Sequence, residues 1–344
     1  MLVNIANAQA KSGADVHICI INNLYVQELV HAFQKGISLH FLNRKLQSKG
    51  IGFIIRLNRL LMQITPDAIH LHDSRIYTFL WRKRLSRVAS VTLHDLPTGS
   101  LRRGGITGRV FPFLFSSENV YFIDKVKRVF AISGAVQDEL WKNYGVKSTV
   151  VYNGILTGKF RLREDKTPKD ALRIVMVSRL EHDKKGQDLL IEAAKKLNSS
   201  VHVDFIGDGS SRAYLENMVK KLHVETTVSL LGSRTQSYIS EHLADYDLFV
   251  QPSRWEGFGL TVAEAMAAKV PVLVSAGQGP AEVTCGDKYG WTFKNGDIGD
   301  LTKKIKYIFE HYDEAREKAE EATNYVSNTY DVSITARNYL KMYI

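Results

Sequence analysis

The feature that most constrains this chain is a repeated alternation of short apolar runs with longer segments of helical spacing. The apolar runs have the length of β-strands. They are Val16–Ile21, Ile37–Leu42, Ala68–Leu71, Ser90–Leu93, Arg128–Ile132, Leu172–Val177, Val201–Ile206, Val228–Leu231, Leu248–Val250 and Val270–Val274. Helical patterns between them include Leu189–Leu197, Tyr214–Leu222 and Leu301–Phe309. Apolar strands that alternate with helices predict an α/β fold with parallel sheets.

The alternation is interrupted over Asn153–Asp170, where the sequence is polar, highly charged and contains Pro168. A chain of 344 residues is long enough for two domains, and a polar interruption is typical of an interdomain linker. We therefore expect a first α/β domain over residues 1–154, a linker over 155–170 and a second domain over 171–327. A last helix, residues 328–344, is expected to cross back to the first domain. The cleft between the two domains is the expected ligand site.

Composition excludes several classes of protein. Hydrophobic residues make up 44% of the chain and charged residues 24%, so it is neither disordered nor fibrous. Cys19 and Cys285 are the only cysteines, which argues against a disulfide framework and favours a reducing cytoplasm. Lys11 and Asp15 interrupt the first apolar stretch, so no signal peptide is expected. No apolar window reaches the ~18 residues of a spanning helix.

The positive charge is concentrated in the first half of the chain. Residues 1–150 hold 20 Lys and Arg against 9 Asp and Glu, whereas residues 151–344 hold 26 against 27. Nucleic acid, an anionic membrane surface or a phosphorylated substrate could each match such a surface, and so could an ordinary basic exterior in contact with water. The helical segments 51–64 and 81–87 carry candidate membrane-facing arginines, with a plain solvated face as an equal alternative. These arginines are Arg56, Arg59, Arg82, Arg84 and Arg87.

Residues 255–267 form the strongest functional motif. Gly257 and Gly259 allow the backbone to turn sharply after the strand and to approach a ligand. A helix is predicted to start near Gly259, and its free N–H groups and positive dipole end suit a phosphate. Glu256 precedes this helix and Glu264 lies on its second turn among small apolar residues, where an idle surface carboxylate is not expected. Accepting hydrogen bonds from sugar hydroxyls is a suitable task for both carboxylates.

A second motif, residues 177–186, follows another predicted strand. Arg179 and Lys185 lie six residues apart on its loop, so a guanidinium and an ammonium could hold one diphosphate from two sides. A solvated loop is the alternative, and Lys184 and Lys185 alone would suit it. Arg179 is harder to explain in that way because it directly follows a buried strand.

Together these motifs resemble the retaining GT-B glycosyltransferases of family 4, and the resemblance extends over nearly the whole chain. Glu256 and Glu264 match the Glu-x₇-Glu element of that family, and Arg179 and Lys185 match its basic pair. Weaker matches are Val151–Ile155 with Phe160, Ile206–Gly209, Gly279–Glu282, Asp67–His72 and Thr92–Asp95.

The resemblance implies a GT-B fold, in which two Rossmann-like parallel-sheet domains face a central cleft. It implies that Glu264 holds the ribose hydroxyls, that Arg179 and Lys185 bind the diphosphate, and that Glu256 binds the donor sugar. The donor would be a nucleotide-sugar, with a UDP-sugar first, and no further cofactor or metal is expected. Further residues implied at the donor are Gly207, Gly232, Phe258, Gly259 and Leu260.

In the first domain the resemblance implies that His94 lies across the cleft from the donor sugar. The implied catalytic set is therefore Glu256, His94, Arg179 and Lys185. A core histidine at a strand end is the alternative for His94. The loop Gly232–Tyr238 would lie near the nucleobase.

Three features depart from the family pattern. The helical pattern starts at Leu2, so the family's first strand and Gly-Gly turn are expected to be missing. Lys269 stands where the family often has glycine before a Val-Pro pair. Asp245-Tyr246-Asp247 imitates the Asp-x-Asp metal motif of the other large glycosyltransferase fold, but it leads into an apolar strand, and we expect no metal there.

We therefore expect a metal-independent, retaining hexosyltransferase that acts on a glycan or a lipid-linked acceptor, in surface polysaccharide or lipopolysaccharide biosynthesis. The expected location is the cytoplasm, with the inner face of the cell membrane as a peripheral site, and no nucleic-acid partner. A catalytically impaired sugar-nucleotide-binding protein is the alternative, because of the missing strand. A sugar-nucleotide epimerase would need different acids in the cleft. A nicotinamide dehydrogenase would need a Gly-x-Gly-x-x-Gly turn after a strand, which the sequence lacks.

Overall fold

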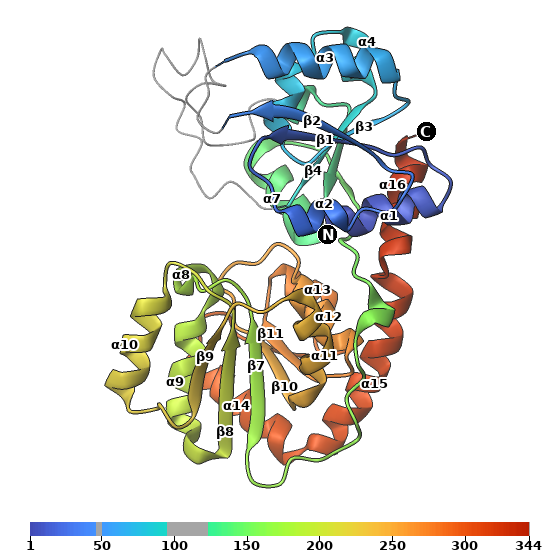
Figure 1. The fold of residues 1–344 in the computed structure, drawn as a ribbon. Helices are drawn as coiled ribbons and strands as arrows, with labels where there is room; N and C mark the ends of the chain where they lie inside the picture. The colour runs from blue at the N-terminus through green and yellow to red at the C-terminus, as the bar shows by residue number, and fades with distance from the viewer. Residues whose placement is uncertain (46–49, 95–122, 344) are drawn as a thin grey trace. The chain divides into compact units, whose positions relative to one another are not determined.

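The computed structural model describes residues 1–45, 50–94 and 123–343, and the chain divides into two compact units. Unit 1 combines Met1–Gly154 with Val332–Ile344, and unit 2 is Ile155–Asp331. Figure 1 shows the two units as a blue-to-green body that also receives the red end of the chain, and a green-to-orange body. Each unit is built from parallel strands and helices, as the alternating sequence predicts.

Unit 1 contains two separate parallel sheets rather than one continuous sheet. In the two-stranded sheet β1 (His17–Asn22) pairs with β2 (Ser38–Arg44). In the four-stranded sheet the order is β3 (Ile69–Leu71), β4 (Ala89–Leu93), β5 (Arg128–Ala131) and β6 (Thr149–Val150). The described helices of this unit are α1 (Leu2–Lys11), α2 (Gln27–His31), α3 (Gly52–Ile64), α4 (Lys83–Arg87), α7 (Gly134–Tyr144) and α16 (Val332–Tyr343), with 3₁₀ turns η1 (Ser74–Phe79) and η2 (Ile123–Lys125).

Helix α16 completes the core of unit 1 although it lies at the far end of the sequence. Its residues Val332 and Tyr339 are buried against Ile5, Phe130 and Val151. The approach is tight, because a Cβ atom built on Gly154 would lie 2.5 Å from the Thr335 hydroxyl oxygen. The last helix therefore belongs to the interior of unit 1.

Unit 2 contains one six-stranded parallel sheet with the strand order β12-β11-β10-β7-β8-β9. Its strands are β7 (Leu172–Val177), β8 (Val201–Ile206), β9 (Val228–Gly232), β10 (Leu248–Gln251), β11 (Val272–Ser275) and β12 (Trp291–Phe293). Its helices are α8 (His182–Lys185), α9 (Gln187–Leu197), α10 (Arg212–Leu222), α11 (Gln236–His242), α12 (Leu260–Ala267), α13 (Gly279–Val283), α14 (Ile298–Glu310) and α15 (Tyr312–Thr329), with 3₁₀ turns η3 (Thr157–Lys159), η4 (Asn198–Ser200) and η5 (Leu243–Asp245).

The central strands of unit 2 explain why the sequence shows continuous apolar runs. Leu172, Val203 and Phe249 are fully buried, and helices such as α9 and α14 supply further core residues. A parallel sheet with helices on both faces requires apolar side chains on both faces of each strand. All the strands predicted from the sequence form, whereas β6 and β12 were not predicted because they are too short to produce a clear run.

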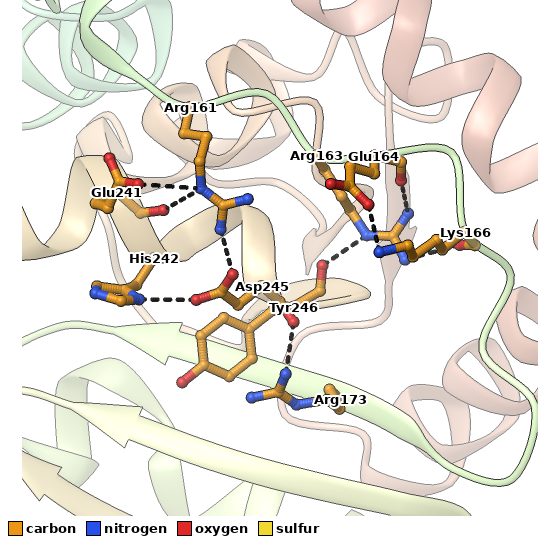
Figure 2. A network of polar contacts seen from close by, with 9 residues as sticks. All are labelled: Arg161, Arg163, Glu164, Lys166, Arg173, Glu241, His242, Asp245 and Tyr246. Atoms are coloured by element: carbon orange, nitrogen blue, oxygen red, sulfur yellow. Dashed lines mark hydrogen bonds and ion pairs between the residues drawn. The ribbon is translucent and has the colours of Figure 1, made fainter.

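The segment interpreted as a linker, 155–170, runs along unit 2 and is tied to it by side chains. Arg163 is only 8% exposed; its Nε donates to the Tyr246 carbonyl at 2.8 Å, and its Nη2 pairs with Asp247. Arg161 pairs with Asp245 and donates to the Glu241 carbonyl at 2.8 Å, as Figure 2 shows. The two aspartates of the Asp-x-Asp sequence therefore anchor this segment.

Lys269, the position at which the family often has glycine, has a left-handed backbone with φ 61°. Glycine adopts this conformation without the cost that a Cβ atom brings. Here the lysine side chain pairs with both Asp165 and Glu320, so it joins the arginine-anchored segment to helix α15. Compared with glycine, Lys269 therefore carries the conformational cost of a left-handed backbone but forms two ion pairs.

In the part of the chain that the structure describes, no helix combines the length and the apolar character needed to cross a membrane.

Candidate functional site

The sheet of unit 2 has a point at which its strand order reverses. Strand β7 lies at this point, with β8 on one side and β10 on the other. The connections that leave β7 and β10 start at the same edge and run to opposite faces, and open α/β sheets bind ligands outside such an edge. The two motifs singled out from the sequence, residues 177–186 and 255–267, lie along these connections. The fold therefore brings the motifs together.

Glycines allow the loops at this edge to touch through their backbones. Gly186 has φ 71°, and a Cβ atom there would lie 2.1 Å from the Pro252 carbonyl oxygen. Gly207 has φ 144°, and a Cβ atom there would lie 1.9 Å from the Ser178 carbonyl oxygen. The Gly207 amide also donates to the Gly232 carbonyl at 3.0 Å. The loop after β7 is thus held between the loop after β10 and the ends of β8 and β9.

Lys185 and Glu256 form the ion pair at the centre of this edge. The Lys185 ammonium donates to a carboxylate oxygen of Glu256, and the two side chains are 10% and 20% exposed. The Glu256 backbone is held as well, since its amide donates to Gln278 at 3.2 Å and its carbonyl accepts from the Gly279 amide at 3.0 Å. Each charge offsets the cost of burying the other. The pair presents a cation and an anion from different loops at one place.

Arg179 is placed differently from Lys185. Its guanidinium is 69% exposed and pairs with Glu181 on the same loop at 3.0 Å. Its backbone is fixed, because the buried Gln187 side chain donates to the Arg179 carbonyl at 2.8 Å. The structure therefore brings Lys185 and Glu256 together, while the Arg179 side chain points to a local partner.

Arg254 was missed from the sequence although it lies between the two motifs in space. Its guanidinium bonds both carboxylate oxygens of Asp188, at 2.8 and 2.7 Å, and the His182 carbonyl at 2.8 Å. Its backbone amide donates to the Lys184 carbonyl at 2.9 Å. Such a bidentate pair fixes geometry as well as charge. Arg254 thus locks the loop after β10 to helices α8 and α9, and a charged residue beside a strand end was its only sequence signal.

The first turn of helix α12 lies directly after these loops, as the sequence predicts. Gly259 precedes the helix with φ 92°, and Phe258 before it is buried, with its ring nearly perpendicular to the Tyr330 ring. In this fully described stretch no side chain caps the first amides of α12. The amides and the positive end of the helix dipole therefore remain suited to an anion.

Glu264, on the second turn of α12, is a carboxyl group with an altered proton affinity. Burial raises the pKa of Glu264 from 4.5 to about 7, although a hydrogen bond from Gln236 acts in the opposite direction. The Gln236 side-chain amide donates to Glu264 at 2.8 Å. Gln236 lies within the segment 232–238 that was predicted as a loop near the nucleobase, and the structure corrects its last three residues to the start of helix α11. A ligand hydroxyl that donates a hydrogen bond to the ionised carboxylate would stabilise the charged form of Glu264 and so oppose the rise in its pKa.

His94 belongs to unit 1, at the end of β4. His94 Nε2 and His72 Nδ1 lie 2.8 Å apart, and the two rings stack with centroids separated by 5.1 Å. Burial lowers the pKa of both His72 and His94 to about 4, so both imidazoles are neutral at pH 7. The pair therefore shares one N–H between them. His72 lies in a segment that the sequence flagged, but its contact with His94 was not predicted.

No cluster of three or more His, Cys, Asp or Glu side chains suited to a metal ion occurs within residues 1–45, 50–94 and 123–343. Of the Asp-x-Asp sequence, Asp245 contacts His242 and Arg161, and Asp247 contacts Arg163 and the Arg173 amide. These two carboxylates thus have structural partners in unit 2.

Comparison with known proteins agrees with the motifs. The family model described as Glycosyltransferase Family 4 matches residues 1–159, and the model described as Glycosyl transferases group 1 matches residues 159–325. An uncharacterised glycosyltransferase of Methanocaldococcus jannaschii is 26% identical over 282 residues, which cover 79% of this chain and 74% of that protein. The amylovoran biosynthesis glycosyltransferase AmsK of Erwinia amylovora is 32% identical over 164 residues, which cover 45% of this chain and 40% of that protein.

The crystal structure of HepE from Anabaena in complex with UDP-glucose is also similar, with a TM-score of 0.78, 20% identity and coverage of 99% of this chain and 94% of that chain. This likeness confirms the predicted GT-B architecture of two Rossmann-like domains. The two family models adjoin at residue 159 and together cover almost all of the chain. The first half of the chain therefore matches a Glycosyltransferase Family 4 model and the second half a Glycosyl transferases group 1 model.

Proposed function

We propose that this glycosyltransferase moves a hexose from a nucleotide-sugar to a glycan or lipid-linked acceptor, with retention of the anomeric configuration. The observation that carries the proposal is the contact between Lys185 and Glu256 beside the first turn of α12. A cation and helix amides suit a diphosphate, and an adjacent carboxylate suits sugar hydroxyls. A UDP-sugar is the proposed donor, and UDP-glucose in the similar HepE structure supports this choice.

In the proposed reaction Glu264 accepts hydrogen bonds from the ribose, and Glu256 accepts them from the donor sugar. The bond between the anomeric carbon and the diphosphate oxygen breaks, while the acceptor oxygen attacks from the same face. Lys185, Arg179 and the amides of residues 258–260 stabilise the charge that develops on the departing diphosphate. The diphosphate oxygen takes the acceptor proton, so no separate carboxylate base is needed. Gly207 and Gly232 let the backbone approach the nucleotide.

His94 is proposed to hydrogen-bond the donor sugar or the acceptor. Support comes from its protonation state, since burial lowers its pKa to about 4 and leaves a neutral ring that can donate or accept. We propose that no divalent metal is required, because Lys185 and Arg179 bring positive charge to the diphosphate. Retained turnover in excess chelator would support this, and a strict requirement for added metal would contradict it.

The acceptor is proposed to belong to surface polysaccharide or lipopolysaccharide biosynthesis. The name of AmsK, a relative in amylovoran biosynthesis, supports a polysaccharide acceptor. A cytoplasmic location is proposed as well, since Cys19 and Cys285 are both free thiols and Cys285 is exposed. Exposed thiols persist in reducing compartments.

The test is a donor screen followed by product analysis. Thermal shift and saturation-transfer NMR with UDP-, GDP- and ADP-sugars would identify the donor, and NMR of the product would give its anomeric configuration. Binding without transfer to any glycan or lipid-linked acceptor would favour the catalytically impaired alternative. Binding of no nucleotide-sugar would contradict the proposal.

A further inference from the structure

The outer surface formed by helices α3 and α4 in unit 1 combines exposed apolar side chains with cations. On α3 and its cap the exposed apolar residues are Ile51, Ile55 and Met62, which are 63%, 43% and 41% exposed. Their intervals of four and seven residues place them in one stripe along the helix. The buried face of the same helix carries Phe53 and Leu57. Helix α3 is therefore apolar on its core face and also along part of its outer face.

Trp81 extends this stripe across to α4. The buried Asn58 of α3 accepts the Trp81 backbone amide at 2.9 Å and donates to the Phe79 carbonyl at 2.7 Å. These bonds hold the start of α4 beside α3, as Figure 1 shows. The Trp81 side chain itself is 58% exposed. A tryptophan fixed by its backbone but left open to solvent is well suited to the boundary between water and lipid headgroups.

The charged side chains on α3 and α4 themselves all have one sign. Residues 50–66 and 80–94, which include α3 and α4, contain no aspartate or glutamate. The cations among them are exposed: Arg56, Arg59, Arg82, Lys83, Arg84 and Arg87. Arg56 bonds the Leu42 carbonyl at 3.0 Å through its Nε atom. Within the described ranges none of the other five forms an ion pair with a carboxylate.

We propose that this surface, Ile51, Ile55, Met62 and Trp81 with the cations of α4, docks unit 1 on an anionic lipid bilayer. The apolar stripe would enter the headgroup region while the arginines and the lysine contact lipid phosphates. A second copy of the chain is a poor partner, because two surfaces of the same positive sign repel each other. A soluble phosphorylated acceptor would use the cations but would gain little from exposed isoleucine, methionine and tryptophan.

The experiment uses the full chain with vesicles of phosphatidylcholine alone or mixed with phosphatidylglycerol. The test variant R82Q/K83Q/R84Q/R87Q removes four cations from α4. The matched control K195Q/K196Q/K220Q/K221Q removes four exposed lysines from α9 and α10 of unit 2. Each cation near an anionic bilayer contributes about fivefold, so the α4 variant should bind more than about 100-fold more weakly, while the control changes little.

Trp81 supplies an independent readout. Binding of the wild type should shift its emission to shorter wavelength, and Trp81→Phe should abolish that shift while leaving the other tryptophans as a background. Binding should weaken as the screening length falls from about 30 Å at 0.01 M salt to about 8 Å at 0.15 M. Trp81→Ser should weaken binding even at low salt.

The outcomes separate this surface from the glycosyl transfer proposed above, on which it does not depend. Equal binding to neutral and anionic vesicles, equal loss in the α4 variant and the control, or no Trp81 shift would overturn the docking surface. So would loss of transfer to a short soluble acceptor in the α4 variant, because the cations would then serve that acceptor. Vesicle binding by a chain that transfers no sugar would leave the docking surface standing and overturn the proposed function.

Discussion

Lys185 contacts Glu256 although 71 residues separate them in the sequence. The first lies on α8 after β7, and the second follows β10. Strands β7 and β10 are neighbours in the sheet, but two further strands lie between them in the chain. The contact therefore depends on the strand order, and it joins the two halves of the proposed donor site into one arrangement of charge.

Replacing Lys185 and Arg179 should have different effects on stability but similar effects on catalysis. Lys185→Ala leaves a poorly exposed carboxylate unpaired and should lower the free energy of unfolding by about 1–3 kcal/mol. Arg179→Ala removes an exposed side chain and should change it by less than about 0.5 kcal/mol. Both should lower turnover at saturating donor by about 100-fold, because charge on the diphosphate develops in the transition state.

Urea unfolding and steady-state kinetics on the same preparations would check this. Lys185→Arg, which keeps the charge, serves as the control and should recover part of the turnover. Near-complete turnover in Arg179→Ala would remove Arg179 from the proposed diphosphate site.

Glu264 should make both stability and donor affinity depend on pH. Its pKa is raised from 4.5 to about 7 in the folded chain, so the folded chain holds this proton more tightly than the unfolded chain. Its stabilising contribution is then full below about pH 4.5 and is lost as the pH rises through about 7. Compared with Glu264→Gln, the wild type should lose roughly 3 kcal/mol across this window.

Nucleotide binding should follow the opposite trend, because ribose hydroxyls donate to the charged carboxylate. Calorimetry should show affinity that rises with pH through about 7 in the wild type. In Glu264→Gln the affinity should be weaker and nearly independent of pH. Donor affinity that is equal in both proteins at every pH would show that Glu264 does not contact the nucleotide.

Asp247 and Asp245 should differ sharply when each is replaced by alanine. Asp247 pairs with a guanidinium whose side chain is 7% exposed, so Asp247→Ala leaves Arg163 charged and buried. This should cost about 3–5 kcal/mol of unfolding free energy. Asp245 pairs with Arg161 at the surface, with side chains 37% and 35% exposed, and its loss should cost about 0–1 kcal/mol.

Thermal and urea unfolding of the two variants would measure the difference. A metal role for this sequence would instead predict that both variants lose activity alike and that added divalent ions stabilise the wild type alone.

Substitutions of Lys269 should separate the free-energy cost of its left-handed backbone from the contribution of its ion pairs. Lys269→Ala keeps the left-handed backbone cost and removes the ion pairs with Asp165 and Glu320, whereas Lys269→Gly removes both. The glycine variant should therefore be more stable than the alanine variant by about 1–2 kcal/mol. Unfolding in urea would measure this, and equal stability would mean that the φ angle of this residue carries no cost.

The sequence predicted every described strand except β6 and β12. In the central strands of unit 2 the signal was a continuous apolar run, because these strands are buried on two faces. It also predicted the start of α12, because Gly259 indicates a turn and helix-forming residues follow it directly. It did not predict the tie between residues 155–170 and unit 2, since a polar segment is read as a linker unless its partners are known. Arg163 and Asp247 find each other only in the folded chain.

The residues of the candidate site also divide into those that the sequence predicted and those that it did not. Glu256, Glu264 and Lys185 were chosen from residue type and loop position, and these criteria do not depend on long-range geometry. The partners Gln236, Arg254 and His72 were missed because each acts through a contact with a residue distant in sequence. Residue patterns therefore predicted which groups carry charge at the site, whereas strand order determines which groups meet.

The inclusion of α16 in unit 1 has a consequence for how the protein folds while it is being synthesised. Residues 1–154 are synthesised before residue 332, yet their core lacks Val332 and Tyr339 until α16 has been made. Unit 2, which is continuous in sequence, can close its sheet earlier. Unit 1 thus completes its core only after unit 2 has been synthesised, and a chain stalled before residue 332 would expose Phe130 and Val151 to the cell's chaperones and proteases.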